Sequence, residues 1–201
     1  MTQVSRRHLL AGAAGAAAVY GAATAHAATT SDLNICAAPT FDESFDLVVI
    51  GSGGAGLSSA VMAKQQGVKR ILVLEKMAFL GGNTAISGGG FNSYDPPRQQ
   101  AQGIKDSPEL HFENTYDGGD RRANPELVHA MTENSYAAIQ WLESIGMKFK
   151  PNVYQIYGGL YPRCHAPYGS LGSDYIKVLK AQCDKLGIEI RTNSRVVRVL
   201  R

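Results

Sequence analysis

The sequence predicts an α/β fold in which a parallel sheet lies between helices, as in a three-layer, Rossmann-like domain. Two observations carry this prediction. An apolar run, a Gly-rich turn, a helical stretch and a second apolar run follow one another over residues 45–75. The order of helix, glycine and short apolar run then returns over residues 173–191. Alternating strands and helices are typical of a parallel sheet.

The first of these units contains a GxGxxG motif in the setting of a dinucleotide-binding βαβ unit. The motif covers residues 51–56, follows a strand predicted over 45–50 and opens a helix predicted to run to about Gln66. A second strand, predicted over 71–74, ends on Glu75, 24 residues after the first glycine of the motif. This full context favours a nucleotide site over a Gly-rich turn that occurs by chance.

Each part of the motif has a physical role. Gly51 is expected to allow the tight turn, Gly53 to let the backbone approach a pyrophosphate, and Gly56 to let the helix pack closely on the strand. The helix N-terminus at Gly54 offers unpaired N–H groups and a positive dipole end to phosphates. Glu75 can accept hydrogen bonds from the ribose hydroxyls of an adenosine.

Residues 1–27 are predicted to be a signal peptide that is removed from the mature protein. Arg6 and Arg7 precede a weakly apolar stretch, and Ala25-His26-Ala27 is a small-x-small site, so cleavage is expected after Ala27. The arginine pair favours a twin-arginine signal over an ordinary secretory signal. A protein that folds around a cytoplasmic nucleotide cofactor must be exported already folded, which agrees with that route. The predicted location is therefore the periplasm.

Length, charge and cysteine content exclude several functions. The apolar stretch of the leader is shorter than the roughly 20 residues of a membrane span, which predicts no membrane insertion. Removal of residues 1–27 lowers the formal charge from +3 to +1, which argues against nucleic acid as a partner. The sequence has no CxxCH motif and hence no covalent c-type haem on this chain. Residues 28–44 are predicted to be a linker, and residues 45–201 to belong to the nucleotide domain.

A second Gly-rich segment, residues 81–90, contains five glycines. Next to a nucleotide site, these glycines predict a close approach of the backbone to a ligand. A flexible loop is the alternative. It is disfavoured because the polar Asn83 and Thr84 and the apolar Ala85 and Ile86 are unlike a low-complexity segment.

The middle of the chain is predicted to be irregular first and helical afterwards. Prolines and an Asp-Gly-Gly-Asp turn interrupt residues 91–123, where only a short helix at 107–116 is expected. A long helix is expected over 124–145, with Asn124 as N-cap and Gly146 after its end. Its buried face is expected to contain Leu127, Met131, Ile139, Leu142 and Ile145.

The last part of the chain repeats the α/β pattern. A helix is expected over 173–186, with Ser173 as N-cap and Gly187 as its stop. Two strands are then predicted, over 188–191 and over 196–199.

Together these features resemble the flavoprotein family of fumarate reductase and succinate dehydrogenase. The resemblance is to its soluble, flavocytochrome c branch, which includes fumarate, methacrylate and urocanate reductases and 3-ketosteroid dehydrogenases. It covers residues 45–201 and rests on separate motifs in the family's order: residues 45–57, Leu74-Glu75-Lys76, Gly81-Gly82-Asn83-Thr84, Gly88–Asn92 and residues 186–193.

The resemblance implies an FAD-binding domain and assigns cofactor residues by position. Glu75 would hold the adenosine ribose, Val196 would meet the adenine through its backbone, and Ala55 would lie by the pyrophosphate. Residues 83–84 would contact the pyrophosphate and ribityl region, and residues 89–90 would bring backbone N–H groups close to the isoalloxazine. The full set expected to bind the cofactor is Gly51, Gly53, Gly54, Ala55, Gly56, Glu75, Lys76, Gly82, Asn83, Thr84, Gly88, Gly89, Gly90 and Val196.

The resemblance also implies how the FAD is attached. In the membrane-bound members of the family, a histidine in the second Gly-rich segment carries FAD covalently. Asn83 occupies the matching position here. Because asparagine cannot form that bond, the FAD is expected to be non-covalent.

Arg163-Cys164-His165 resembles an Arg-x-His segment that precedes a helix in the soluble members. One interpretation is a catalytic Arg–His pair. The other is a structural anchor that positions Gly169 and the helix that follows it. The anchor is favoured, because a single histidine without an identified partner carries little catalytic information.

The family's substrate-binding histidines and arginines lie downstream of this segment. The chain is therefore expected to be the N-terminal part of a longer protein, without the capping domain and the rest of the FAD domain. It would contribute cofactor-binding residues and no catalytic residue.

The resemblance implies a flavin-dependent reductase of an activated C=C bond in a small unsaturated carboxylate, such as fumarate, methacrylate or urocanate. A separate periplasmic c-type cytochrome would donate the electrons in anaerobic respiration. A 3-ketosteroid dehydrogenase-like enzyme and a non-catalytic FAD-binding module are the alternatives.

Overall fold

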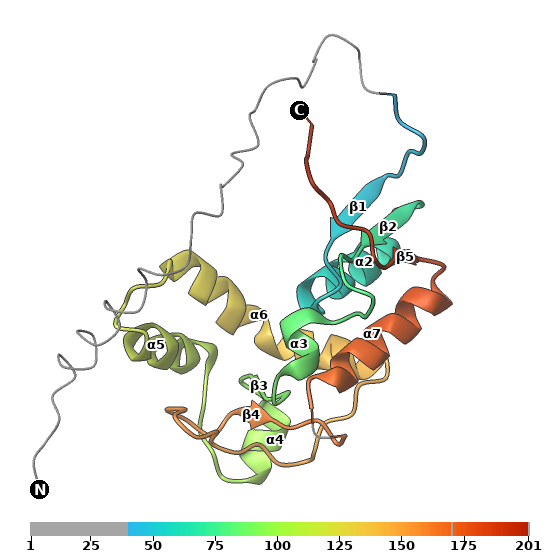
Figure 1. The fold of residues 1–201 in the computed structure, drawn as a ribbon. Coiled ribbons are helices and arrows are strands. Elements are labelled where there is room, and N and C mark those ends of the chain that lie inside the picture. Colours follow the sequence, from blue (N-terminus) through green and yellow to red (C-terminus); the bar gives the residue numbers. More distant parts are fainter. Residues whose placement is uncertain (1–39, 170, 201) are drawn as a thin grey trace, which may run out of the picture. The chain divides into compact units, whose positions relative to one another are not determined.

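The computed structural model describes residues 40–169 and 171–200 of the chain. The chain divides at Asp42 into two units, and the unit that begins at Glu43 contains the helices and strands described below (Figure 1). The predicted signal peptide, its cleavage site and the predicted linker up to residue 39 lie outside the described residues.

A parallel three-stranded sheet forms the first layer of this unit. Strands β1 (Leu47–Ile50), β2 (Ile71–Leu74) and β5 (Glu189–Arg191) lie in the order β1-β2-β5. In the first pair, Leu47 lies opposite Ile71. Because all pairs are parallel, the carboxyl ends of the three strands meet at one edge of the sheet. This edge is where open α/β sheets bind their ligands.

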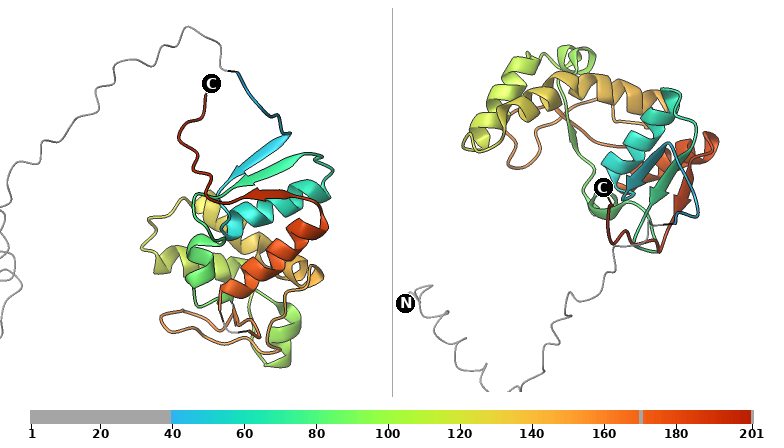
Figure 2. Two further views of the ribbon diagram at one scale, coloured as in Figure 1. Left: turned by 45° about the vertical axis from the view of Figure 1, so that its right-hand side comes forward. Right: turned by 90° about the horizontal axis from the view of Figure 1, so that it is seen from above.

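Helices α2 (Gly54–Gln65) and α7 (Ser173–Lys185) cover one face of the sheet, as Figure 2 shows. The core between helices and strands includes the fully buried Leu57, Val61, Val73, Leu179 and Cys183. On the opposite face of β1, Val48 and Ile50 are 45% and 60% exposed. The predicted α/β, Rossmann-like class is confirmed, and the described residues supply two of its three layers.

Three further helices follow the short α3 (Gly82–Ile86). They are α4 (Pro96–Ala101), α5 (Pro108–Gly118) and α6 (Pro125–Ser144). Each starts with proline, and the side chain before that proline accepts a hydrogen bond from a backbone N–H of the first turn, which caps the helix. The capping residues are Asp95, Ser107 and Asn124. In the described part of the chain, no helix is both long and apolar enough to cross a membrane.

A two-stranded antiparallel ribbon connects the second Gly-rich segment to the end of this helical region. Strand β3 (Phe91–Asn92) pairs with β4 (Cys164–His165), with Phe91 opposite His165. The ribbon joins segments more than 70 residues apart and fixes the chain directly after Gly90.

The predicted helices at 107–116 and 124–145 are confirmed, but four local predictions are wrong. Helix α4 lies within residues 91–123, where the only helix expected was the one at 107–116, because Asp95 caps a helix that begins at Pro96. Residues 196–199 form no strand, because no neighbouring strand among the described residues pairs with them. Gly172, not Ser173, is the N-cap of α7, and no side chain caps it. Leu127 and Met131 are 70% and 49% exposed, because the first half of α6 packs against α5 instead of the core.

Candidate functional site

The turn between β1 and α2 has the shape that the GxGxxG motif predicts. Gly51 has a φ of +98°, in the left-handed region that favours glycine. A Cβ at Gly56 would overlap with the carbonyl oxygen of Gly51, so only glycine lets α2 pack against this turn. At Gly53, a Cβ would meet only the Gly81 carbonyl oxygen, at 3.8 Å. The backbone at Gly53 is therefore accessible to a ligand.

The two Gly-rich segments lie side by side at the N-terminus of α2. Gly53 and Gly81 form a parallel bridge, and the Gly54 N–H donates to Thr84 Oγ1 at 3.0 Å. Gly81 has a φ of +111°, and a Cβ there would lie 2.6 Å from the Ala85 Cβ. Residues 51–56 and 81–84, which are separate in the sequence, thus form one surface.

Glu75 is buried at the carboxyl end of β2 and connects these segments. Its Oε2 accepts hydrogen bonds from the Ser52 N–H at 3.0 Å and the Ser52 hydroxyl at 2.6 Å, and its Oε1 accepts from the Met77 N–H at 2.9 Å. The Ser52 hydroxyl in turn accepts from the Gly81 N–H at 3.2 Å. The hydrogen bond from the Ser52 hydroxyl, followed by that from Met77, lowers the pKa of Glu75 and keeps the carboxylate charged.

We expect the substitution Glu75→Gln to lower the free energy of unfolding by about 1–2 kcal/mol at neutral pH. The amide NH₂ that replaces one carboxylate oxygen cannot accept a hydrogen bond from Ser52 or Met77. Because the folded-state pKa of Glu75 lies below its ordinary value of 4.5, this stabilisation is present above pH 4.5 and is lost as the pH falls through the folded-state pKa.

Urea denaturation between pH 3 and pH 7 would measure this effect. The difference between the protein and the E75Q variant should shrink toward acidic pH, and Glu113→Gln, at an exposed position of α5, should have little effect. A difference that stays constant across this range would contradict the role given to the Glu75 carboxylate.

A first cavity of about 330 Å³ lies at this edge of the sheet. It brings together six of the predicted cofactor residues: Gly51, Gly53, Glu75, Lys76, Gly82 and Val196. Ser52, Ser194 and Arg195 complete the polar part of its wall, which Met77 also lines. Val196 thus lies beside the β2 carboxyl end although it is not in a strand.

A second cavity of about 230 Å³ lies on the other side of the α2 N-terminus. Four more predicted residues line it: Gly54, Thr84, Gly89 and Gly90. The Tyr175 hydroxyl donates to the Gly89 carbonyl oxygen at 2.8 Å, and a Cβ at Gly90 would lie 2.7 Å from Cys164 Sγ. Residues 89–90 are therefore held from both α7 and β4.

The other four predicted residues line neither cavity. Ala55, Asn83 and Gly88 are exposed. Gly56 acts in the packing of α2 on the turn, as described above. The backbone at Gly53 and Gly54, with the Thr84 hydroxyl, lies between the two cavities. This arrangement suits a long ligand whose phosphates meet the N–H groups of a helix N-terminus.

Arg163 and His165 are buried and serve as structural anchors. Arg163 Nε and Nη2 donate to the two carboxylate oxygens of Asp106, at 2.9 and 2.6 Å. His165 Nε2 lies 3.0 Å from Asp95 Oδ2, and its Nδ1 lies 3.1 Å from the Phe91 carbonyl oxygen. These contacts agree with the interpretation as an anchor, but they hold β3 and α4 rather than Gly169.

Several residues of these walls were not predicted from the sequence. Ser52 lies inside the GxGxxG motif, and a hydroxyl two residues after the end of β1 could have been connected with the acid that follows β2. Ser194 and Arg195 follow β5 closely, and residues directly after a parallel strand are expected at the carboxyl edge, where ligands bind. Their position in the sequence could therefore have identified them. Tyr175 left no such signal, because its contact with Gly89 spans 86 residues.

Comparison with known proteins agrees with this geometry. Residues 46–201 match the family model described as FAD binding domain. The chain is 37% identical over 161 residues to the fumarate reductase (cytochrome) of Shewanella frigidimarina, covering 79% of this chain and 28% of that protein. It is 30% identical over 192 residues to the acrylate reductase flavoprotein subunit of Shewanella woodyi, covering 96% of this chain and 37% of that protein.

A solved structure of a flavocytochrome c3 fumarate reductase in its open conformation matches with a TM-score of 0.74. The identity is 34%, and the match covers 79% of this chain and 28% of that chain. The chain thus spans about a third or less of the length of these relatives.

Proposed function

Because the chain belongs to the family of FAD binding domains, we propose that it holds FAD non-covalently along the two cavities and is the cofactor-binding part of a reductase of unsaturated carboxylates. The observation that carries the proposal is the parallel contact of Gly53 with Gly81 at the carboxyl edge, next to the charged Glu75. The similarity to fumarate and acrylate reductases supports the substrate class.

The described residues fit an adenine dinucleotide. The cavity that contains Glu75 offers a carboxylate for ribose hydroxyls and the backbone near Val196 for a base. The open backbone at Gly53 leaves room for a pyrophosphate at the N-terminus of α2. The cavity of residues 89–90, with apolar Phe91 and Leu142 in its wall, would take the ring system. Asn83 is exposed and cannot form a covalent flavin link.

FAD, when bound, supplies the exchange of two electrons as hydride with an acceptor. The residues of this chain bind and orient it. Glu75, oriented by Ser52 and Met77, would fix the adenosine end. Tyr175 and the β3–β4 ribbon would hold the backbone of residues 89–90 in place. The groups that bind the carboxylate substrate and supply the proton belong to other parts of the protein.

We further propose that the protein works in the periplasm, in anaerobic respiration, and receives electrons from a separate c-type cytochrome. The paired Arg6 and Arg7 of the predicted leader support export, and the similarity to a flavocytochrome c3 fumarate reductase supports a c-type cytochrome as the electron donor.

The reaction can be tested with the purified full-length protein and a reduced viologen dye. Fumarate, methacrylate, acrylate and urocanate would be offered in turn, and a 3-ketosteroid would serve as the comparison acceptor. At least one enoate should oxidise the dye with typical enzyme turnover, on the order of 1 to 10³ per second. If no enoate oxidises the dye while the protein contains FAD, the reductase proposal is wrong and the FAD proposal stands.

A further inference from the structure

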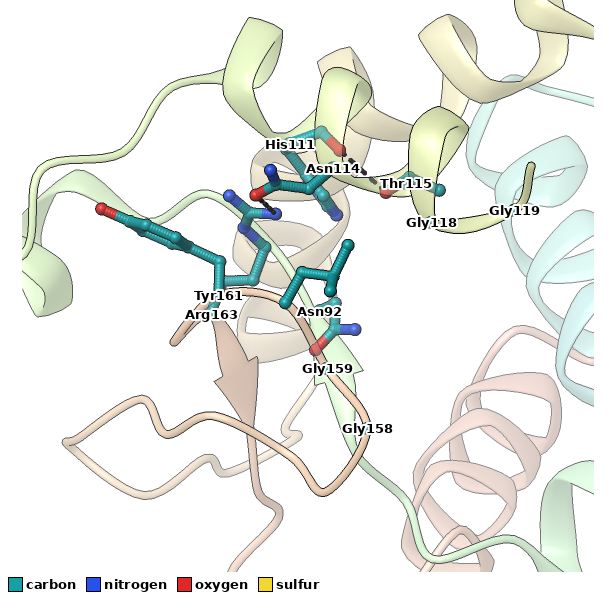
Figure 3. Close-up of a pocket in the computed structure, with 11 residues that line it drawn as sticks. Asn92, His111, Asn114, Thr115, Gly118, Gly119, Gly158, Gly159, Tyr161 and Arg163 are labelled. Atoms are coloured by element: carbon teal, nitrogen blue, oxygen red, sulfur yellow. Dashed lines mark hydrogen bonds between the residues drawn. The ribbon is translucent and has the colours of Figure 1, made fainter. Parts of the chain in front are cut away.

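A third cavity of about 330 Å³ lies apart from the two cavities described above (Figure 3). It shares no wall residue with them. Its wall consists of α5, the end of β3 and the segment before β4. Helix α5 contributes His111, Asn114, Thr115 and Gly118, which lie on one side of the helix because they are three, four and seven residues apart.

His111 is the feature of this cavity that needs an explanation. Its side chain is 2% exposed, and among the described residues its Nδ1 is the buried side-chain atom that has no hydrogen-bond partner. Figure 3 shows its ring on the same side as Asn114 and Arg163. A buried polar atom without a partner costs about 1–3 kcal/mol, so a ligand that pairs with it would bind favourably.

The groups around His111 have more donors than acceptors to offer. Arg163 has five N–H bonds and uses three of them, two to Asp106 and one from Nη1 to Asn114 Oδ1 at 3.2 Å. None of the described residues accepts a hydrogen bond from the Asn114 side-chain amide. The Thr115 hydroxyl donates to the His111 carbonyl oxygen at 2.8 Å. The cavity therefore suits a ligand with two acceptor oxygens.

The charges in the wall balance before any ligand enters. Arg163 is paired with Asp106, which has a fully buried carboxylate. Burial, and then repulsion by Arg163, lower the pKa of His111 to about 4, so its ring is neutral at neutral pH. Tyr161 stacks on the Arg163 guanidinium, and the α6 residues on the other side of His111 are uncharged: Ala130, Met131, Asn134 and Ser135.

We propose that this cavity binds a small monocarboxylate between Arg163 and His111, and that His111 takes up one proton from solution when the ligand binds. The carboxylate would accept from the unused N–H groups of Arg163 and Asn114 and from the protonated His111. The bound carboxylate would attract both Arg163 and the protonated His111, and these two attractions would offset the repulsion between the two cations. Since a water takes about 30 Å³ of liquid, the cavity of about 330 Å³ has the volume of about eleven waters, which leaves room for a small carboxylate such as acetate.

Calorimetric titration of the purified protein with acetate, in two buffers of different ionisation enthalpy, would test the proposal. We expect net proton uptake on acetate binding between pH 5 and pH 7, with an affinity that falls as the pH rises through this range. Acetamide, which has the same shape and no charge, should cause no proton uptake. Because the site is separate from the FAD cavities, this result does not depend on the proposed reductase function.

The variant His111→Gln should bind acetate at least tenfold more weakly and without proton uptake. His129→Gln, on the half-exposed ring that stacks on Phe112, is the matched control and should bind as the unchanged protein does. If His111→Gln does not fold, the pH dependence of acetate binding to the unchanged protein still tests whether a proton is taken up. No acetate binding, binding without proton uptake, or proton uptake that persists in H111Q would each overturn the proposal.

Discussion

Replacing Arg163 by leucine is expected to lower the free energy of unfolding by about 3–5 kcal/mol, because it leaves a buried carboxylate without its cation. Asp106 would keep its hydrogen bonds from the Gln99 amide and the Ser107 N–H, at 2.7 and 2.9 Å, but these carry no positive charge. The side chains of both partners in the pair are almost fully buried. The loss would thus reflect desolvation of an unpaired charge.

Urea denaturation at neutral pH would measure this loss. Arg121→Leu, which breaks the exposed pair with Asp117 on α5, is the matched control and should cost about 0.5 kcal/mol or less. The double variant Arg163→Leu with Asp106→Leu should recover part of the stability, because no charge then stays buried. Equal losses for Arg163→Leu and Arg121→Leu would show that the pair does not anchor the ribbon.

Replacing Gly56 by alanine is expected to prevent correct packing of α2 and to cost about 3 kcal/mol or more. The new Cβ would overlap with the Gly51 carbonyl oxygen, and neither backbone segment can move without shifting β1 or α2. The purified variant should unfold at a much lower urea concentration than the unchanged protein and should contain little flavin.

Gly53→Ala is the matched control for this prediction, since it places the same methyl group in open space. Gly53 has a φ of −67°, which alanine adopts readily, so the fold should be stable to within about 1 kcal/mol. The methyl group would occupy the space given to the pyrophosphate, and FAD affinity should fall about 10- to 100-fold, equivalent to about 1.4–2.8 kcal/mol. Wild-type FAD affinity in G53A, or normal stability in G56A, would contradict the roles assigned to these glycines.

The parts of the fold that are set by residues adjacent in the sequence could be predicted. The turn at residues 51–56 needs glycine for reasons of local geometry, and the acid that ends β2 is found by its distance from that turn. Helices α5 and α6 are each preceded by a capping residue, Ser107 or Asn124, and each begins with proline, a pattern that marks a helix start in the sequence. These signals require no knowledge of the tertiary structure.

The predictions that failed depend on which segments lie next to each other. Residues 196–199 have the composition of a strand, but a strand needs a partner, and composition does not supply one. Leu127 and Met131 fit the period of a buried face, yet that part of α6 packs on α5. The third cavity combines Arg163 with His111 from segments about 50 residues apart, a contact that no local pattern encodes.

Non-covalent binding of FAD is tested most directly by measuring FAD on the purified full-length protein before and after denaturation. We predict close to one FAD per chain, and acid precipitation should release all of the yellow colour into the supernatant. This result would follow from a site built of backbone N–H groups, Glu75 and an asparagine at position 83. Colour that stays on the precipitated chain, or a folded protein that neither contains nor binds FAD, would contradict it.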